Sequence, residues 1–246
     1  MHDLVQDLRF AVRMLARNPA FTAVAVLALA LGMGVNTAVF TVVNGVLLRP
    51  LPFPEPERLF LISYNSERGP FNAGPALSDG HFLEFRRHLR LFEPIASFAR
   101  YPVSLTGTGE PIRLSAATVT PDFLTVLRVN AAMGRTFLAD EDQAGRNHVA
   151  LLSDKLWRRR FGADPQVLGK TITLDGNAHT VIGIMPAGFT FPYDAELWTP
   201  LAVRIDAHNS FLRPVVGRLR PGVSAKQAQA EVEAVAREQH QRQREL

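Results

Sequence analysis

The stretch LALALGMGVNTAVFTVVNGVLL, residues 27–48, combines a Gly-x-Gly-x-x-Thr pattern with a complete absence of charged side chains. A dinucleotide-binding turn would place such glycines between a buried strand and an amphipathic helix. Here Thr37 stands where the third glycine is needed, and the residues after it lack the polar face of an amphipathic helix. Because a partial glycine motif is weak evidence by itself, the stretch favours an apolar helix.

The uncharged run extends outward from this stretch to Phe21, so that residues 21–48 form 28 consecutive positions without Asp, Glu, Lys, Arg or His. A helix needs about 20 apolar residues to cross the hydrocarbon core of a bilayer. The run is longer than the apolar part of a secretory signal peptide, and no small-residue cleavage site ends it. The sequence therefore predicts a transmembrane helix over residues 21–48.

Small and polar residues within this predicted helix recur at helical spacing. Residues separated by three or four positions lie on one face of a helix, and a stripe of small residues lets another helix approach closely. We expect a helix-packing interface here. Its residues are Ala30, Gly34, Ala38, Thr41 and Gly45, with Asn44 near the edge as a hydrogen-bonding partner.

Residues 1–20 precede the predicted span and have the pattern of a short amphipathic helix. Leucine and valine recur at helical spacing, and three arginines follow another stripe, which predicts a helix at the cytoplasmic or interfacial membrane surface. Three arginines also lie in residues 49–68. The positive-inside comparison is therefore a tie, and charge alone does not fix the orientation.

Residues 49–246 have the composition of a folded α+β domain. Four prolines within residues 50–56 predict an extended connector. Strands and helices then mix without regular β-α-β alternation. The predicted strands are 59–64, two within 103–119, 148–153, a hairpin over 170–184 around Asp175-Gly176-Asn177, and 213–219. The predicted helices are 79–88, one beginning near Thr120, 154–161, and a final helix after the Ser224–Gln227 capping box.

Composition narrows the class of protein. Hydrophobic residues make up 47% of the 246 residues, which is typical of a globular chain, and the formal net charge is only +4. The basic residues are scattered, so no nucleic-acid-binding footprint is indicated. The chain has no cysteine, which excludes disulfides, thiol catalysis and cysteine-based zinc sites.

Three short patterns resemble chemical sites without meeting their requirements. Gly169-Lys170-Thr171 lacks the correctly spaced earlier glycine of a phosphate-binding loop and leads into a strand pattern. His81, Glu84 and His88 share one predicted helix, but their spacing rarely converges on one ion. The acidic run at residues 140–142 is interpreted as a loop or helix cap. With no nucleophile-elbow or zinc-protease motif present, we expect neither enzyme activity nor a bound cofactor or metal.

Several of these segments together resemble one family. The run LARNPAFTAVAVLALALGMGVNTAVFTVVNGVLLRPLPFPEPERL is similar to the start of MacB-type ABC transporter permeases, especially the duplicated orphan permease group. Three further segments resemble the periplasmic core domain of those permeases. They are VTPDFLTVLRVNAAMGRTF, VALLSDKLWRRRFGADPQVLGKTITLDGNAHTVIGIMPAGFTFP and VVGRLRPGVSAKQAQAEV.

The resemblance implies an inner-membrane permease subunit whose extracytoplasmic domain, residues 49–246, is built from two α+β lobes. It implies an efflux role in which this domain transmits force or contacts a substrate, with partners that include a separate ABC ATPase, membrane lipid, and further permease helices or a second copy. Family members continue into later membrane helices, so we expect a truncated protein or a fragment. The alternatives are a stand-alone membrane-anchored binding or sensor domain and a soluble nucleotide-dependent enzyme.

Overall fold

The computed structural model describes residues 13–14, 17, 19–43, 51–63, 76–202 and 211–244. The chain divides into two compact units, Met1–Pro52 and Phe53–Leu246. Most of the surface helix predicted over residues 1–20 lies outside the described residues, so that expectation stays a prediction.

The first unit contains helix α2, Pro19–Val43. Proline is favoured in the first turn of a helix because the backbone N–H that it lacks would have no partner there. Among the described side chains, large apolar residues such as Val24, Leu27 and Leu31 are exposed. No helix within the described ranges combines the length and apolar character needed to cross a membrane. The span predicted over residues 21–48 includes residues 44–48, which lie outside the described residues, so it stays a prediction.

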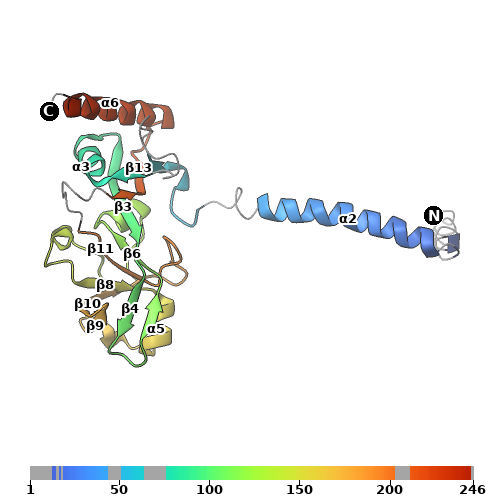
Figure 1. Cartoon of the computed structure of the whole chain (residues 1–246), viewed down its shortest axis with the longest axis horizontal. Coiled ribbons are helices and arrows are strands. Elements are labelled where there is room, and N and C mark those ends of the chain that lie inside the picture. Colours follow the sequence, from blue (N-terminus) through green and yellow to red (C-terminus); the bar gives the residue numbers. More distant parts are fainter. Residues whose placement is uncertain are drawn as a thin grey trace. The chain divides into compact units, whose positions relative to one another are not determined.

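The second unit is built on an eleven-stranded mixed sheet, which confirms the α+β class (Figure 1). Its strand order is β1-β13-β3-β6-β11-β8-β10-β9-β4-β5, with β7 added beside β10. The pairs β10–β8 and β11–β6 are parallel, and the other pairs are antiparallel. The strands are β1 Leu59–Ile62, β3 Phe92–Arg100, β4 Val103–Thr106, β5 Ile112–Leu114, β6 Ala116–Val119, β7 Met133–Gly134, β8 Val149–Leu152, β9 Thr171–Leu174, β10 Asn177–Ile184, β11 Leu197–Pro200 and β13 Val215–Leu219. A separate two-stranded sheet pairs β2, Leu77–Ser78, with β12, Leu212–Arg213.

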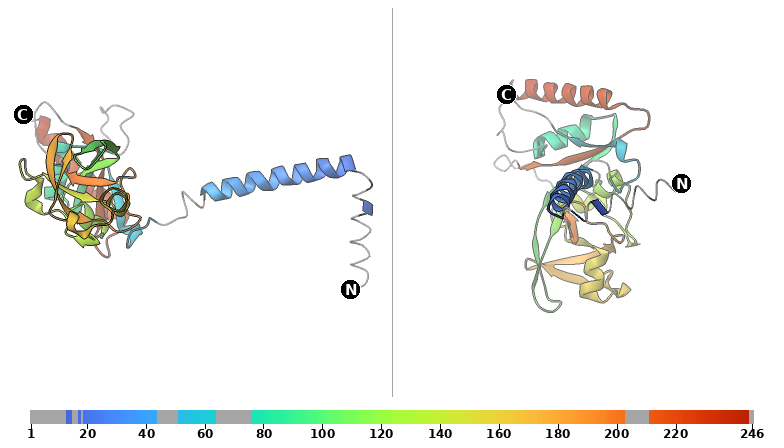
Figure 2. Two further views of the ribbon diagram at one scale, coloured as in Figure 1. Left: turned by 90° about the horizontal axis from the view of Figure 1, so that it is seen from below. Right: turned by 90° about the vertical axis from the view of Figure 1, so that its right-hand side faces the viewer.

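Four helices accompany this sheet: α3 Asp79–His88, α4 Phe123–Leu127, α5 Asp154–Phe161 and α6 Ala225–Arg244. Ser78 and Ser153 cap α3 and α5 by accepting a hydrogen bond from the backbone N–H three residues later. Gly162 ends α5 in the left-handed conformation. The capping box expected at Ser224 and Gln227 also forms. Helix α6 packs against α3, as the views in Figure 2 show.

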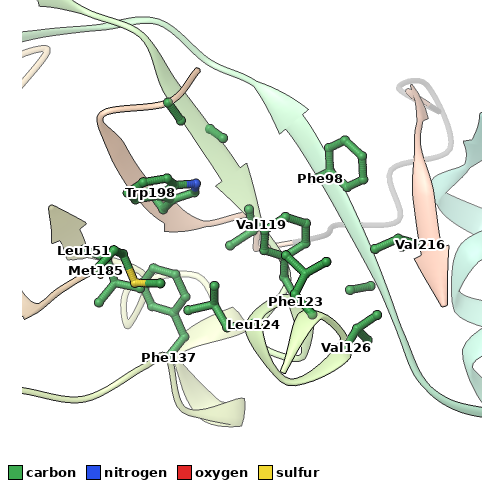
Figure 3. Close-up of a cluster of buried hydrophobic side chains, with 14 of the residues drawn as sticks. Phe98, Val119, Phe123, Leu124, Val126, Phe137, Leu151, Met185, Trp198 and Val216 are labelled. Atoms are coloured by element: carbon green, nitrogen blue, oxygen red, sulfur yellow. The ribbon is translucent and has the colours of Figure 1, made fainter. Parts of the chain in front are cut away.

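Three hydrophobic clusters fill the domain. The central cluster joins α4 to strands β3, β6, β8, β11 and β13, and its aromatic and aliphatic side chains are drawn in Figure 3. A second cluster lies beneath α5, and a third lies between α3, α6 and the β1–β13 end of the sheet. The resemblance implied two lobes, but one continuous sheet connects these ends and Phe53–Leu246 is one compact unit.

Several predicted elements need correction. Residues 103–119 contain three strands instead of two, because Ser115 separates β5 from β6 and β6 pairs with β3 and β11. The connector includes a short 3-10 helix, Pro56–Arg58, and is not extended throughout. Strands β3, β7 and β11 were not predicted, although β3 is the longest strand of the sheet.

Candidate functional site

The predicted helix-packing stripe lies on α2 only in part. Ala30 and Gly34 are exposed there, and a Cβ added at Gly34 would meet no atom within 4 Å. Ala38 and Thr41 belong to the helix, but their side chains lie outside the described set, as do Asn44 and Gly45 entirely. The stripe therefore remains a prediction about association with another helix.

The short chemical patterns singled out in the sequence have structural roles. Thr171 begins strand β9, and Lys170 Nζ lies 3.1 Å from Asp164 Oδ2. His81 Nδ1 lies 2.6 Å from Ser78 Oγ, and His88 contacts Glu84. No group of three potential metal ligands occurs within the described ranges.

The acidic run forms a 3-10 helix, Ala139–Asp142, whose carboxylates hold neighbouring groups. Glu141 accepts two hydrogen bonds from Arg135, Asp140 pairs with Arg146, and Asp142 accepts one from the backbone N–H of Ala202. The run is thus a short 3-10 helix and not a loop, and only the capping role is observed, at Glu141, which accepts a hydrogen bond from the backbone N–H of Leu138.

An extended polar network of described residues lies where the chain enters the core domain, at Phe53–Arg58. Phe53 is buried in the central cluster, with its ring centroid 5.6 Å from that of Phe191 in an edge-to-face arrangement. Two residues later, Glu55 adopts the left-handed conformation and precedes the short 3-10 helix. A non-glycine residue in this conformation is uncommon, and its neighbours hold it there through the contacts described next.

Glu55 and Arg58 form a network with two other chain segments. The carboxylate of Glu55 pairs with Arg58 and, at 2.7 Å, with Arg128 Nη1. Arg58 Nη2 lies 2.7 Å from Glu93 Oε1, and Arg58 Nε donates to the carbonyl of Leu219 at 2.9 Å. The entry segment is thus fastened to β3, to the end of α4 and to the end of β13.

Arg218 is the buried member of this network. It belongs to β13 and is 0% exposed. Its Nε donates to the carbonyl of Val126 at 2.8 Å, and its Nη1 donates to the carbonyl of Glu55 at 3.0 Å. A buried guanidinium is costly unless hydrogen bonds and nearby opposite charge compensate for it. Here two backbone carbonyls and the nearby charges of Glu55 and Glu93 supply part of that compensation, while Nη2 is buried without a hydrogen-bond partner among the described residues.

We call Glu55, Arg58, Glu93, Arg128 and Arg218 the entry network. Hydrogen bonding from Arg58, aided by Arg128, lowers the pKa of Glu55 below its ordinary value despite the opposing effect of burial. Burial and then the charge of Arg128 lower the pKa of Arg218, while the carboxylates oppose them. A carboxylate with a lowered pKa is a weak base, so the network is suited to holding the chain and not to acid–base catalysis.

Sequence reasoning missed the entry network because its members are scattered over 163 positions. One local signal was present. Arg218 is the single charged residue in the strand VVGRL, whose five positions are all buried. A charge in such a strand indicates a specific buried partner, because an unpaired buried charge is strongly disfavoured.

Residues 22–235 match the family described as the MacB-like periplasmic core domain. The chain belongs to this family. The match covers α2 from Thr22 onward, the entry network and the sheet of the MacB-like core domain. No curated protein matches the chain.

Solved structures share this fold at low sequence identity. The periplasmic region of MacB from Actinobacillus actinomycetemcomitans aligns with a TM-score of 0.57 and 14% identity, covering 74% of this chain and 83% of that one. A permease domain from Porphyromonas gingivalis gives 0.54 and 20%, covering 71% and 80%. The extracellular domain of the transporter YknZ from Gram-positive bacteria gives 0.52 and 17%, covering 70% and 86%. The MacB-like core fold therefore persists across strongly diverged sequences.

Proposed function

We propose that this protein is the permease subunit, or part of one, of a MacB-type ABC transporter in the cell inner membrane. The observation that carries the proposal is the family match over residues 22–235. In this proposal residues 21–48 anchor the chain once in the membrane, and residues 49–246 lie outside the cytoplasm. The uncharged run of 28 residues supports the anchor, because it is long enough to cross the hydrocarbon core as a helix.

The entry network supports a role in force transmission for efflux. It ties the segment that follows the proposed anchor to three elements of the sheet domain through charged hydrogen bonds, which are about twice as strong as neutral ones. A displacement of this segment would therefore move the sheet as one body. The partners in this proposal are a separate ABC ATPase and further permease helices or a second permease copy.

Membrane extraction and co-purification test the proposal. The full chain, expressed in its native host, is expected to stay with the membrane after alkaline washing and to co-purify with an ATPase subunit in mild detergent. External protease is expected to digest residues 49–246 in spheroplasts. Release by alkaline washing would contradict the anchor. Retention in the membrane without any ATPase would instead favour the alternative, a stand-alone anchored binding or sensor domain.

A pair of variants tests force transmission separately from assembly. Arg128→Gln removes charged contacts from the entry network, whereas Arg158→Gln breaks an exposed pair with Asp154 on α5. Both variants are expected to co-purify with the ATPase, and only Arg128→Gln is expected to lower transport per ATP hydrolysed. Equal transport per ATP hydrolysed in the two variants would show that the entry network does not transmit force.

A further inference from the structure

Two histidines lie side by side on the core sheet, where β8 and β10 run parallel to each other (Figure 1). His148 immediately precedes β8, and the backbone N–H of Thr180 in β10 donates a hydrogen bond of 2.9 Å to its carbonyl. His179 is the residue before Thr180. The strand pairing thus holds the two imidazoles together, with ring centroids 5.1 Å apart and an angle of 46° between the ring planes.

Both imidazoles project from the same face of the sheet. Successive side chains of a strand alternate between its two faces, so His148 shares a face with Ala150, and His179 shares a face with Val181. Ala150 and Val181 are paired in register, and both belong to the hydrophobic cluster beneath α5. The histidines therefore continue this face beyond the cluster, where His148 is exposed and His179 is half-buried.

A cleft of about 560 Å³ gives access to both rings. The same alternation brings Thr118 and Thr199 to this face, because Ala116 and Leu197 belong to the cluster beneath α5. These two threonines line the cleft together with the histidines, and their hydroxyls make no hydrogen bond with a described residue. The cleft thus leaves room beside the rings for water molecules or another small ligand.

Each ring has a nitrogen that can act as a ligand. His179 Nδ1 lies 3.1 Å from the backbone carbonyl oxygen of Asn177. Since this oxygen can only accept, Nδ1 of the neutral ring carries the hydrogen, and Nε2 keeps its lone pair. Metal-ligating histidines are usually oriented by such a hydrogen bond from the other ring nitrogen. The His148 side chain makes no hydrogen bond or ion pair with a described residue, so its lone pair is free as well.

The separation of the rings matches that of two imidazoles on one metal ion. A zinc–nitrogen bond is about 2.0–2.1 Å long, so each ring centroid would lie about 3.2 Å from the ion, and two rings at the tetrahedral angle would have centroids about 5 Å apart. The observed separation is 5.1 Å. A metal ion can therefore be bound by both rings without a large movement of either strand.

The charged side chains at the cleft do not oppose a bound cation. Arg100 pairs with Ala117 of the central cluster, so its side chain belongs to the opposite face of the sheet. Arg213 pairs with the buried carboxylate of Asp79. Asp175, the one carboxylate that lines the cleft, forms no ion pair with a described residue. No unpaired cation is thus shown to face the rings.

We propose that His148 and His179 together bind one divalent transition-metal ion of the kind that prefers imidazole, such as Zn²⁺, with water from the cleft in the remaining coordination positions. Imidazole suits Zn²⁺, Cu²⁺ and Ni²⁺, whereas Mg²⁺ prefers oxygen ligands. The described ranges contain no group of three such ligands, so this site is an open one with two ligands from the protein. No local motif indicates it in the sequence, because its ligands come from different strands.

The site goes beyond the proposed transport role, and it is tested on the full chain in detergent without an ATPase. Calorimetric titration with ZnCl₂ is expected to show saturable binding, whereas MgCl₂ should not compete. Loss of a hydrogen bond that only orients a ligand already costs about 10–100-fold in metal affinity. We therefore expect His148→Gln and His179→Gln each to weaken Zn²⁺ binding by about tenfold or more.

The double variant and a matched control assign the binding to this pair. If both rings hold one ion, the double variant should bind Zn²⁺ little more weakly than either single variant, because the first substitution already removes the two-ligand site. The control is His88→Gln on α3, since His88 also lies beside a potential ligand, Glu84, but is not part of the cleft. Its affinity for Zn²⁺ should equal that of the parent chain.

Electron paramagnetic resonance of the Cu²⁺-loaded chain provides a second measurement. The nitrogen couplings of two imidazoles are expected in the parent chain and in His88→Gln, and those of one imidazole at most from this site in each single variant. Absence of Zn²⁺ binding would overturn the proposal. Full affinity in His148→Gln or in His179→Gln, or an equal loss of affinity in His88→Gln, would overturn it as well.

Discussion

Arg218 Nη1 donates a hydrogen bond of 3.0 Å to the backbone carbonyl of Glu55, across 163 positions of the chain. This contact joins the segment that enters the core domain to β13, a strand near the C-terminal end of the domain. Since Arg218 is completely buried, the contact is shielded from water and from salt. The buried arginine is therefore a structural element of the fold as well as part of the entry network.

Replacing Arg218 is expected to destabilise the domain. Arg218→Met keeps the length of the side chain but leaves the carbonyls of Val126 and Glu55 without their donor. Unsatisfied buried polar groups cost about 1–3 kcal/mol each, so we expect the free energy of unfolding to fall by about 2–4 kcal/mol in urea titrations. Arg113→Met, at an exposed position, should change it by less than about 0.5 kcal/mol. Similar losses in both variants would contradict the role of Arg218.

A second prediction concerns the close approach of β7 and β10. Gly183 pairs with Gly134, and a Cβ added at Gly183 would lie 2.5 Å from the carbonyl oxygen of Arg135. Because backbone must move to relieve this clash, Gly183→Ala is expected to lower the free energy of unfolding by about 1–3 kcal/mol. Gly80→Ala provides the control in α3, where an added Cβ meets no atom within 4 Å.

The control variant should behave in the opposite way. Alanine is favoured over glycine inside a helix by about 1 kcal/mol, so Gly80→Ala is expected to raise the urea midpoint while Gly183→Ala lowers it. A neutral or stabilising Gly183→Ala would show that β7 does not pack on β10 as described.

Local signals in the sequence were sufficient for much of this fold. Ser78 followed by apolar residues at helical spacing predicted α3 with its observed bounds, and Phe82 and Phe85 are buried as expected. Asp154 and Gly162 likewise mark the two ends of α5, and the hairpin around Asp175-Gly176-Asn177 forms between β9 and β10. These elements are specified by caps and turns that act within a few residues.

Strand β3 could not be recognised by the same means. Pro94 interrupts its pattern, and proline within a run argues against a central strand. In the structure the pairing of β3 with β13 shifts register between Gly217 and Leu219, opposite the segment that contains Pro94. At such a bulge one residue is left unpaired, so the backbone N–H that Pro94 lacks is not needed for strand pairing. This compensation depends on a partner strand more than 100 positions away, as do the contacts of Arg218, so neither could be read from local sequence.

The pH dependence of stability is expected to include a contribution from His179. Burial, with a smaller effect of His148, lowers the pKa of His179 despite the hydrogen bond with the carbonyl of Asn177. Since the unfolded state then binds the proton more readily, stability should fall as pH decreases through about 6.5, the ordinary value. Urea midpoints at pH 7.5 and 5.5 should differ less in His179→Gln than in the parent chain. An unchanged difference would exclude His179 as the source.

Glu55 should contribute at lower pH. Hydrogen bonding from Arg58 lowers the pKa of Glu55 below its ordinary value of 4.5. The ionised carboxylate therefore stabilises the folded state at pH values above 4.5, and this contribution is lost as the pH falls through the folded-state pKa. Glu55→Gln carries no such charge. We therefore expect the urea midpoint of Glu55→Gln to decrease less than that of the parent between pH 6 and pH 3. A steeper decrease in the variant would be incompatible with the pairing to Arg58 and Arg128.

The last prediction addresses the small-residue stripe on α2. If α2 associates with another membrane helix through Ala30 and Gly34, a bulky side chain on the stripe should separate the two backbones, whereas one off the stripe should not. Gly34→Leu is therefore expected to lower self-association or permease assembly several-fold in a membrane two-hybrid assay of residues 1–52. Gly32→Leu is the matched control, since an added Cβ meets no atom within 4 Å at either glycine. Equal association of the two variants would mean that the stripe does not form the contact.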